Sequence, residues 1–329
     1  MKRHIQWALV AGLCVAAAAT ADPFDPAKVP EKTRWFVHAD LKRFKETQLG
    51  AQILKQLAPL SPALELVEKA TGLDPRRDLS GVTLVGLGAK GDEVVVLFSG
   101  QFQQEKLKVA VRGAKEHREL AYGGHALHSW RDDKGAHYGC VYDARTVLMG
   151  DGQPALLALL DVLDKKSPAC KPHEVLARLG KGEEPFTLLA LADMEAFGKL
   201  EPQANLLEKL KLMCLAVGEH RGDFTARLLV QPCEASAAVS VQQALQGLVA
   251  IVQLGDSKKP EIRRAQELAQ RLKIEQADPY VSVRLDVPVK EVLETLKIRL
   301  EAESTAQGKG SLKLELKLGD PPAKPLPPK

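Results

Sequence analysis

The chain has 329 residues, about twice the length of a typical domain, so two domains are the default expectation. It is 45% hydrophobic and 27% charged, which supplies enough apolar material for a packed core and excludes a disordered chain. The net charge is only +4 and aromatic residues make up 5%. This argues against a nucleic-acid-binding protein, because that class gathers a basic excess on one face.

The N-terminus has the pattern of a secretory signal peptide. Residues 1–4 are basic, residues 7–19 form an uncharged apolar run, and residues 19–21 (Ala-Thr-Ala) match the small-x-small site that signal peptidase cleaves. The apolar run is shorter than the about 20 residues that a membrane span needs. We therefore expect cleavage before Asp22, removal of residues 1–21, and export to the periplasm or to the outside of the cell.

No later stretch approaches spanning length, so we expect no transmembrane span after cleavage. The leader contains two of the 46 basic residues and none of the 42 acidic ones, so the mature net charge is +2. This near-balance again excludes a nucleic-acid partner.

The mature chain contains one pattern twice. Residues 35–44 and 188–197 each hold an apolar strand that leads into Ala-Asp, with an apolar residue after the Asp and a Phe four positions after it. The two aspartates, Asp40 and Asp193, are typical of helix N-caps, whose carboxylates accept from free backbone N–H groups.

Each copy continues with a hairpin, a helix, a further strand and a further helix. We therefore expect two related modules, at 33–165 and 186–319. The elements predicted in chain order are a broken helical region at 41–71, a hairpin at 82–99, a helix from Gln103, an extra hairpin at 125–142, a strand at 146–149, a helix at 154–163, a hairpin at 210–230, a helix at 235–254, a strand at 280–285, a helix at 288–300 and a strand at 312–318.

The segments outside the modules are rich in proline, glycine or charge. Residues 166–185 have the composition of a linker, and residues 320–329 contain five prolines and are expected to be a disordered tail. Strand pairs joined by tight turns and interrupted by single helices predict an α+β fold. We expect each module to be an antiparallel sheet with helices packed on one face.

Four cysteines remain after cleavage, and an oxidising compartment allows disulfides among Cys140, Cys170, Cys214 and Cys233 in three pairings. A hairpin that turns at residues 221–222 places Leu229 opposite Cys214. A bridge from Cys214 to Cys233 would then need a bulge, because four residues of strand span about 13 Å. Buried unpaired thiols are the alternative.

The richest polar cluster is the extra hairpin at 125–142. His125 and His128 are three residues apart and point to opposite faces of a strand, so they cannot share a metal ion. Only a diagonal pair of His128 and His137, with Asp132 near the turn, remains as a metal candidate. A solvated surface hairpin is the simpler interpretation, and we expect no metal.

Familiar catalytic motifs are absent or lack their context. Residues 86–91 match GxGxxG, but a strand follows where a dinucleotide site needs a helix N-terminus. The Arg-Gly-Asp at 221–223 is ordinary turn chemistry. Because GxSxG, SxxK and HExxH are also absent, we expect no catalytic residues and no cofactor.

Three segments resemble an uncharacterised family of exported bacterial proteins of unknown function. They are the strand-Ala-Asp-Leu-helix opening, the Gly-Leu-Asp-Pro-Arg-Arg-Asp-Leu run at 72–79, and the Tyr-Gly-Gly-His at 122–125 that precedes Trp130. The resemblance covers mainly residues 33–165. It implies no activity and no site residues that could be transferred.

These observations favour an exported, non-enzymatic binding or scaffold protein of the bacterial envelope, whose partner is an unknown envelope protein or small ligand. We expect its contact surface on open sheet faces or on the strand at 312–318. One alternative is an exported metal-dependent hydrolase that uses the hairpin from His125 to His137. Another is a ligand carrier with a cavity between sheet and helices.

Overall fold

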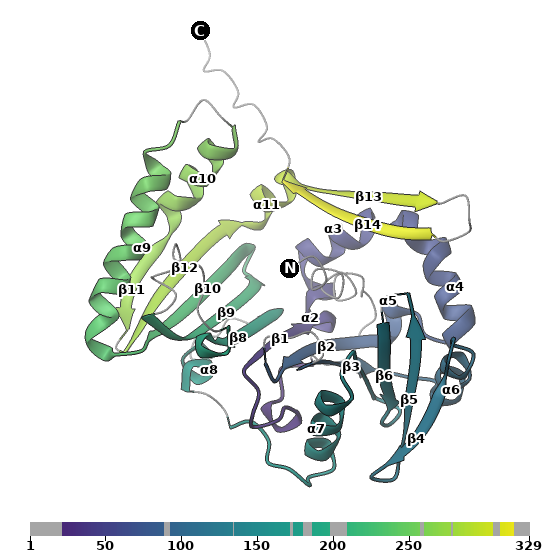
Figure 1. Cartoon of the computed structure of the whole chain (residues 1–329). Helices are drawn as coiled ribbons and strands as arrows, with labels where there is room; N and C mark the ends of the chain where they lie inside the picture. Colours follow the sequence, from purple (N-terminus) through teal and green to yellow (C-terminus); the bar gives the residue numbers. More distant parts are fainter. Residues whose placement is uncertain are drawn as a thin grey trace.

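The structure is a computed structural model that describes residues 22–88, 93–133, 135–171, 174–179, 186–197, 209–256, 260–277, 279–304 and 310–318. The expected leader at 1–21 and the expected tail at 320–329 lie outside these residues. One twisted antiparallel sheet forms the centre of the described chain (Figure 1).

The main sheet has 12 strands in the order β11-β12-β10-β9-β8-β1-β2-β3-β7-β6-β5-β4. Their bounds are β1 (Trp35–Asp40), β2 (Leu79–Gly86), β3 (Val94–Gly100), β4 (Arg118–Tyr122), β5 (His125–Asp132), β6 (Gly135–Val141), β7 (Thr146–Gly150), β8 (Leu188–Asp193), β9 (Leu210–His220), β10 (Asp223–Pro232), β11 (Lys273–Ala277) and β12 (Tyr280–Pro288). A separate pair, β13 (Leu296–Ser304) and β14 (Gly310–Leu318), lies apart from it.

The helices fall between these strands. Their bounds are α2 (Leu41–Glu46), α3 (Gln48–Gln56), α4 (Ser61–Thr71), α5 (Pro75–Asp78), α6 (Gln104–Arg112), α7 (Gln153–Leu163), α8 (Glu174–Leu179), α9 (Ala238–Gln253), α10 (Pro260–Arg271) and α11 (Val289–Thr295), with short 3-10 turns η1 (Pro26–Lys28), η2 (Ala58–Leu60), η4 (Met194–Phe197) and η7 (Ala235–Ala237).

The strand order agrees with a repeated unit. From the centre of the sheet outward, the first half runs β1, β2, β3, β7, β6 and the second runs β8, β9, β10, β12, β11, so these five strands occupy corresponding positions, whereas β5 and β4 at the edge of the first half have no counterpart. The halves meet where β1 pairs antiparallel with β8, with Phe36 opposite Leu191. The predicted α+β fold with antiparallel strands is confirmed, and its two halves share a single sheet.

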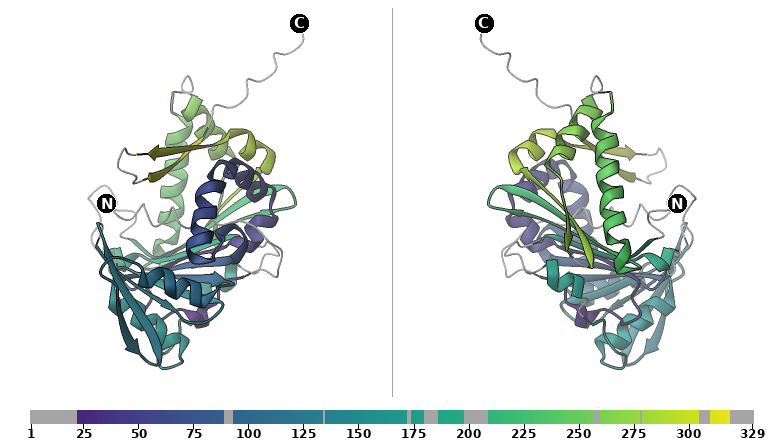
Figure 2. Two further views of the ribbon diagram at one scale, coloured as in Figure 1. Left: turned by 90° about the vertical axis from the view of Figure 1, so that its right-hand side faces the viewer. Right: turned by 90° about the vertical axis from the view of Figure 1, so that its left-hand side faces the viewer.

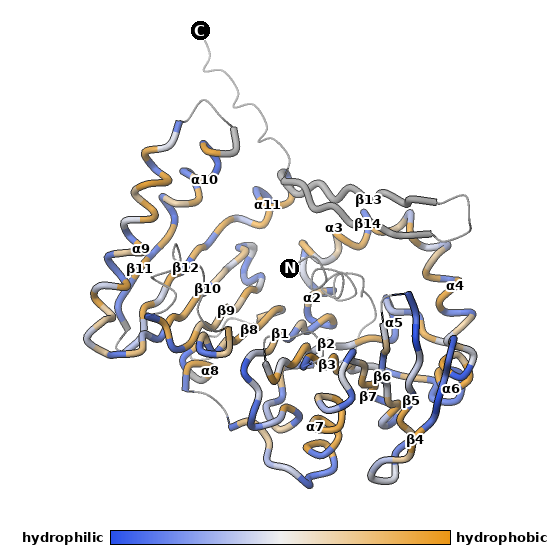
Figure 3. Tube along the Cα trace, viewed as in Figure 1, coloured by the Kyte–Doolittle hydropathy of each residue, from blue (hydrophilic) through white to orange (hydrophobic). Residues whose placement is uncertain are grey.

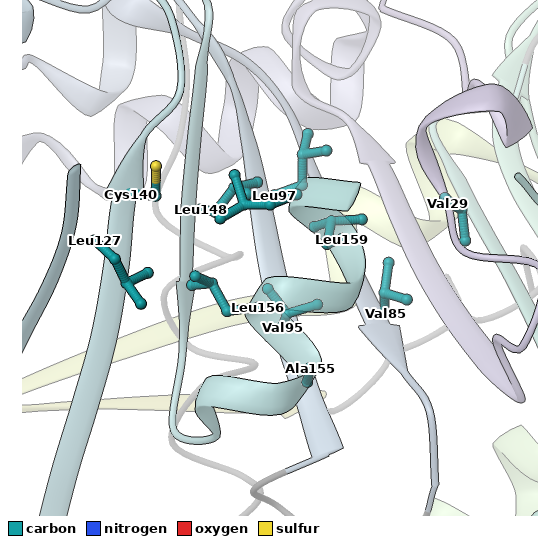
Figure 4. Close-up of a cluster of buried hydrophobic side chains, with 11 residues drawn as sticks. Val29, Val85, Val95, Leu97, Leu127, Cys140, Leu148, Ala155, Leu156 and Leu159 are labelled. Atoms are coloured by element: carbon teal, nitrogen blue, oxygen red, sulfur yellow. The ribbon is translucent and has the colours of Figure 1, made fainter. Parts of the chain in front are cut away.

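Helices lie on both faces of the sheet, where the sequence led us to expect one. In the first half, Val95 packs in a core cluster with Leu159 of α7, which is drawn in Figure 4, and the next residue, Val96, packs with Leu41 of α2 on the other face. The reason is that β3 is apolar at consecutive positions, so both of its faces must be covered. The two views in Figure 2 show helices on either side of the strands.

The second half repeats this arrangement. Leu229 packs with Val175 of α8 on one face, and Val230 packs with Val241 of α9 on the other. Helix α8 lies inside the segment expected to be a linker, and its buried residues Val175 and Leu179 belong to the core of the second half. The linker therefore contains a packed helix.

Both predicted aspartate caps make the expected hydrogen bonds. Asp40 Oδ1 accepts from the backbone N–H of Arg43 at 2.9 Å at the start of α2. Asp193 Oδ1 accepts from the N–H of Glu195 at 3.0 Å at the start of η4, which is a short 3-10 turn. The first cap therefore begins an α-helix and the second a 3-10 turn.

The helix expected at 288–300 ends at Thr295, and β13 follows. From Leu296 to Leu300, apolar and charged residues alternate, which is the period of a strand. This strand pairs with β14, with Ile298 opposite Leu316. The strand expected at 312–318 therefore has a partner of its own, away from the edge of the main sheet.

Candidate functional site

The extra hairpin, β5 and β6, has the register expected from the sequence. Asp132 pairs with Gly135 across the turn and Trp130 pairs with His137. His128 and His137 therefore lie on the same face, one diagonal step apart. The Trp130 ring packs over Gly139, where a Cβ atom would lie only 3.1 Å from the ring, and the ring centroid lies 5.7 Å from that of His137. The two histidines join separate polar networks.

His137 lies between two carboxylates. Its Nε2 is 2.9 Å from Asp132 Oδ1 and its Nδ1 is 2.8 Å from Asp151 Oδ1, and the imidazole is largely buried. Burial lowers the pKa of His137, but hydrogen bonds to Asp132 and Asp151 raise it by more, so its pKa lies above the ordinary value. Two of the three predicted metal candidates thus form a salt-bridge pair with each other.

His128 is the third candidate and is 1% exposed. Its Nδ1 lies 3.0 Å from His117 Nε2 and 3.8 Å from Glu119 Oε2. Its Nε2 is buried with no hydrogen-bond partner among the described residues. Burial lowers the pKa of His128, so its ring is neutral at neutral pH.

The ligating atoms of His117, Glu119 and His128 lie within 4.8 Å of one another, the type of donor set that zinc prefers. This set shares only His128 with the predicted one. Glu119 faces His128 because β4 pairs with β5, and it also binds Arg112 at 3.1 Å. The cation of Arg112 would repel a metal ion at this carboxylate.

His125 lies on the opposite face of the hairpin, as its spacing predicted. Its Nε2 is 2.9 Å from Asp164 Oδ1, and the same carboxylate accepts from Lys166 at 2.7 Å and from Tyr142 at 3.2 Å. The Lys166 and His125 hydrogen bonds lower the pKa of Asp164 to about 2. These contacts attach the end of α7 to the hairpin and hold His125 away from any shared site with His128.

No disulfide joins the four cysteines in the structure. Cys140 and Cys214 are buried in different core clusters, and Leu229 lies opposite Cys214 as the hairpin register predicted. Burial raises the pKa of the Cys140 thiol to about 11 and that of Cys214 to about 12. Such thiols carry almost no thiolate at neutral pH and make poor nucleophiles.

The two motif matches fall on hairpins. Gly86 ends β2, and β3 pairs antiparallel with it, so no helix follows the glycines. Arg221 and Gly222 form the tip of the β9–β10 hairpin with positive φ angles of 51° and 89°, the conformation of a tight two-residue turn. Neither segment has the context that the corresponding functional motif needs.

Helix α9 carries an unusual apolar surface. Its N-terminal half packs on the sheet through Val241 and Leu245. Its C-terminal half leaves large apolar side chains in solvent, with Leu248 52%, Ile251 67% and Leu254 86% exposed. We call these three residues the apolar tip. Figure 3 shows hydrophobic colouring along α9, and Figure 1 shows its far end extending beyond the strands.

The segment Ala235–Gln253 is long and apolar enough to cross a membrane by length and composition, and only 11% of its most apolar window is buried. No charged residue occurs from Ala235 to Gly255. This length corrects our expectation that no later stretch approaches that of a span. The helical spacing of Leu245, Leu248 and Val252 does not show what covers this face, because periodicity does not distinguish a protein core from another apolar surrounding.

Comparison with known proteins gives little guidance. No family model matches the chain, and no curated protein matches it. Among solved structures, crystal form III of TP0453 has a TM-score of 0.47 at 10% identity and covers 84% of this chain and 98% of that chain. Crystal form IV gives 0.47 at 10% identity over 83% and 96%, and crystal form I gives 0.44 at 9% identity over 82% and 96%.

Proposed function

We propose that the chain is an exported, non-enzymatic binding protein of the bacterial envelope, and that it attaches to a lipid surface through the apolar tip of α9. One observation carries this proposal: the exposed side chains of Leu248, Ile251 and Leu254 form one apolar end of an uncharged helix. Contiguous apolar patches of this kind mark surfaces that contact a protein or a membrane.

A lipid surface suits the tip better than a protein partner does. A stable protein interface buries about 20–30 residues on each side, whereas the tip offers a few side chains at one helix end. Lipid needs no complementary shape and can surround a projecting end. In sequence, residues 256–264 after the tip hold four basic and two acidic residues, a net charge of +2 that favours anionic lipid.

The tip would insert at the interface rather than let α9 span the bilayer. Ala238 and Val241, in the first turn of α9, are 0% and 1% exposed and pack on Val230 and Val281 of the sheet. A spanning orientation would remove these contacts. The apolar tip, by contrast, lies at the other end of the helix and can enter lipid without any change in the fold.

The exposed fractions give the strength of this attachment. Full burial of a Leu or Ile side chain contributes about 1.5–3 kcal/mol. Weighted by the exposed fractions of Leu248, Ile251 and Leu254, the tip would gain about 3–6 kcal/mol in lipid. This is comparable to the reversible attachment given by a single acyl chain, and basic residues near anionic lipid add about 1 kcal/mol each.

Co-flotation with vesicles tests the proposal. The mature chain is expected to float with vesicles that contain phosphatidylglycerol, and the double variant Ile251→Asp/Leu254→Asp is expected to stay at the bottom of the gradient. The matched control is Val109→Asp in α6, because Val109 is 66% exposed and Ile251 67%. Flotation that survives the double substitution, or that the control abolishes equally, would contradict the proposal.

One observation favours the hydrolase alternative, namely the group of His117, Glu119 and His128. If it holds zinc, added ZnCl₂ should raise the melting temperature of the wild type and leave that of His117→Leu unchanged. An unchanged melting temperature in the wild type would eliminate this candidate.

A further inference from the structure

A pocket of about 370 Å³ lies between α8 and strands β10, β12 and β11. Its walls include four basic side chains, Arg178, Arg227, Lys273 and Arg284, and one acidic side chain, Glu275. Leu229, which lines it, belongs to the core cluster of α8, whereas α9 covers the other face of these strands. The pocket and the apolar tip therefore belong to opposite faces of the sheet.

Three of these bases form a row across neighbouring strands. Arg227 of β10 pairs directly with Arg284 of β12, and Arg284 pairs directly with Lys273 of β11. Side chains that are directly opposite lie about 5 Å apart on one face, and like charges in such positions repel each other. If these three bases had no function, replacing one of them with a neutral residue would make the fold more stable.

Acidic side chains among the described residues hold two of these bases in place. Asp286 binds Arg284 at 2.7 Å and also accepts a hydrogen bond from Thr225 at 2.9 Å. Glu174 binds Arg178 at 3.0 Å. Glu275 is the third carboxylate at this pocket among the described residues.

The fourth base approaches from above the sheet. The guanidinium carbon of Arg178 lies 4.7 Å from the centroid of the Tyr280 ring, and this ring is itself 3% exposed. Stacking on a buried ring fixes the guanidinium in place with little loss of conformational freedom on binding. The row on the sheet and Arg178 on α8 thus line one pocket from two elements.

We propose that this pocket binds a small organic molecule that carries a phosphate group. Guanidinium groups match phosphate oxygens in paired hydrogen bonds, and a dianion relieves the repulsion in the row. The volume lies at the low end of the range for ligand pockets and exceeds what an inorganic anion needs. Leu229 and the Tyr280 ring would contact the organic part. The proposal goes beyond lipid attachment and does not depend on it.

Thermal unfolding of the mature chain with added glycerol phosphate, at constant ionic strength, tests the proposal. We expect a higher melting temperature for the wild type and an affinity at least about tenfold weaker, or about 1.4 kcal/mol, in Arg227→Gln and Lys273→Gln. The control Lys211→Gln removes one charge from an exposed residue of β9, outside the pocket, and should bind like the wild type.

Without ligand, Lys273→Gln should melt at the same temperature as the wild type or higher, because the substitution relieves the row. The proposal is overturned if glycerol phosphate does not shift the wild type, if it shifts all four proteins equally, or if succinate shifts the wild type as much. It is also overturned if Lys273→Gln melts lower without ligand.

The source of the phosphate group is distinguished by vesicles of phosphatidylcholine with and without phosphatidylglycerol. If phosphatidylglycerol competes with glycerol phosphate in Ile251→Asp/Leu254→Asp, the ligand is a lipid headgroup; if it does not, the ligand is soluble. If the pocket does not bind glycerol phosphate, the wild type should still float with vesicles. If the wild type does not float with vesicles, it should still bind glycerol phosphate.

Discussion

The hydrogen-bonded pair His117 and His128 gives a prediction in which stability changes in opposite directions for its two members. His128→Leu removes a ring nitrogen that has no partner among the described residues, and such an atom costs about 1–3 kcal/mol. It also removes one hydrogen bond to His117, worth about 0.5–1.5 kcal/mol. His117 is half-buried and regains water. We expect the free energy of unfolding to be unchanged or higher by about 1 kcal/mol.

His117→Leu should have the reverse effect. It removes the hydrogen bond of Nδ1, so that neither nitrogen of the His128 ring, which is 1% exposed, has a hydrogen bond to a described residue, and the free energy of unfolding should fall by about 1–3 kcal/mol. The two variants differ from the wild type by the same kind of substitution at the two ends of one hydrogen bond. If the two histidines contributed only by filling space, both substitutions would lower the free energy of unfolding.

The gain in stability of His128→Leu over the wild type should be larger at acidic pH. Burial lowers the pKa of His128 below 6.5 in the native chain, so below pH 6.5 the unfolded chain binds a proton that the native chain does not. Stability therefore falls as the pH drops, by at most about 2 kcal/mol at pH 5 for this group. His128→Leu removes this loss, so its advantage over the wild type should be larger at pH 5 than at pH 8.

Urea unfolding at pH 8 and pH 5, with EDTA present, measures both effects. If His128→Leu is destabilised by more than about 2 kcal/mol at pH 8, the Nε2 atom has a favourable partner and the reasoning is wrong. An advantage that shrinks from pH 8 to pH 5 would equally refute the assignment of a lowered pKa.

Two further predictions concern the same half of the chain. His137→Gln should lower the free energy of unfolding more at pH 5 than at pH 8.5, as measured by urea titration. The reason is that a raised histidine pKa contributes stability below pH 6.5, and this contribution is lost as the pH rises through the native pKa. An equal loss of stability at both pH values would show that Asp132 and Asp151 do not bind the charged ring. Leu159→Ala in α7 should lower the free energy of unfolding by about 2–5 kcal/mol, since Leu159 is 0% exposed. Leu157 is only partly buried, so Leu157→Ala should lower it clearly less. Equal losses would mean that α7 does not cover the sheet as described.

Features set by neighbours in sequence could be predicted. Asp40 caps α2 because a carboxylate after a strand and before an apolar helix has free N–H groups within reach. The hairpin tip at Arg221 and Gly222, and the opposite faces of His125 and His128, follow from turn chemistry and the two-residue period of a strand.

Features that depend on contacts between distant segments of the chain could not be predicted from the sequence. The antiparallel pairing of β1 with β8 joins the halves through two strand edges far apart in the chain, and local pattern does not choose between free edges. His117 escaped notice because β4 is mostly exposed and gives no apolar signal, so its pairing with β5, which brings Glu119 opposite His128, was not foreseen. The exposure of the apolar tip could not be predicted either, because apolar residues at helical spacing give the same sequence pattern whatever covers them.

The most direct test of lipid attachment is whether the end of α9 enters the hydrocarbon layer. Leu254, 86% exposed, can be replaced by tryptophan (Leu254→Trp), and Val109→Trp in α6 provides the control at an exposed position away from α9. With vesicles that contain phosphatidylglycerol and brominated acyl chains, we predict quenching of the added fluorescence in Leu254→Trp and none in Val109→Trp. Fluorescence that is equally unquenched in both variants would contradict the account.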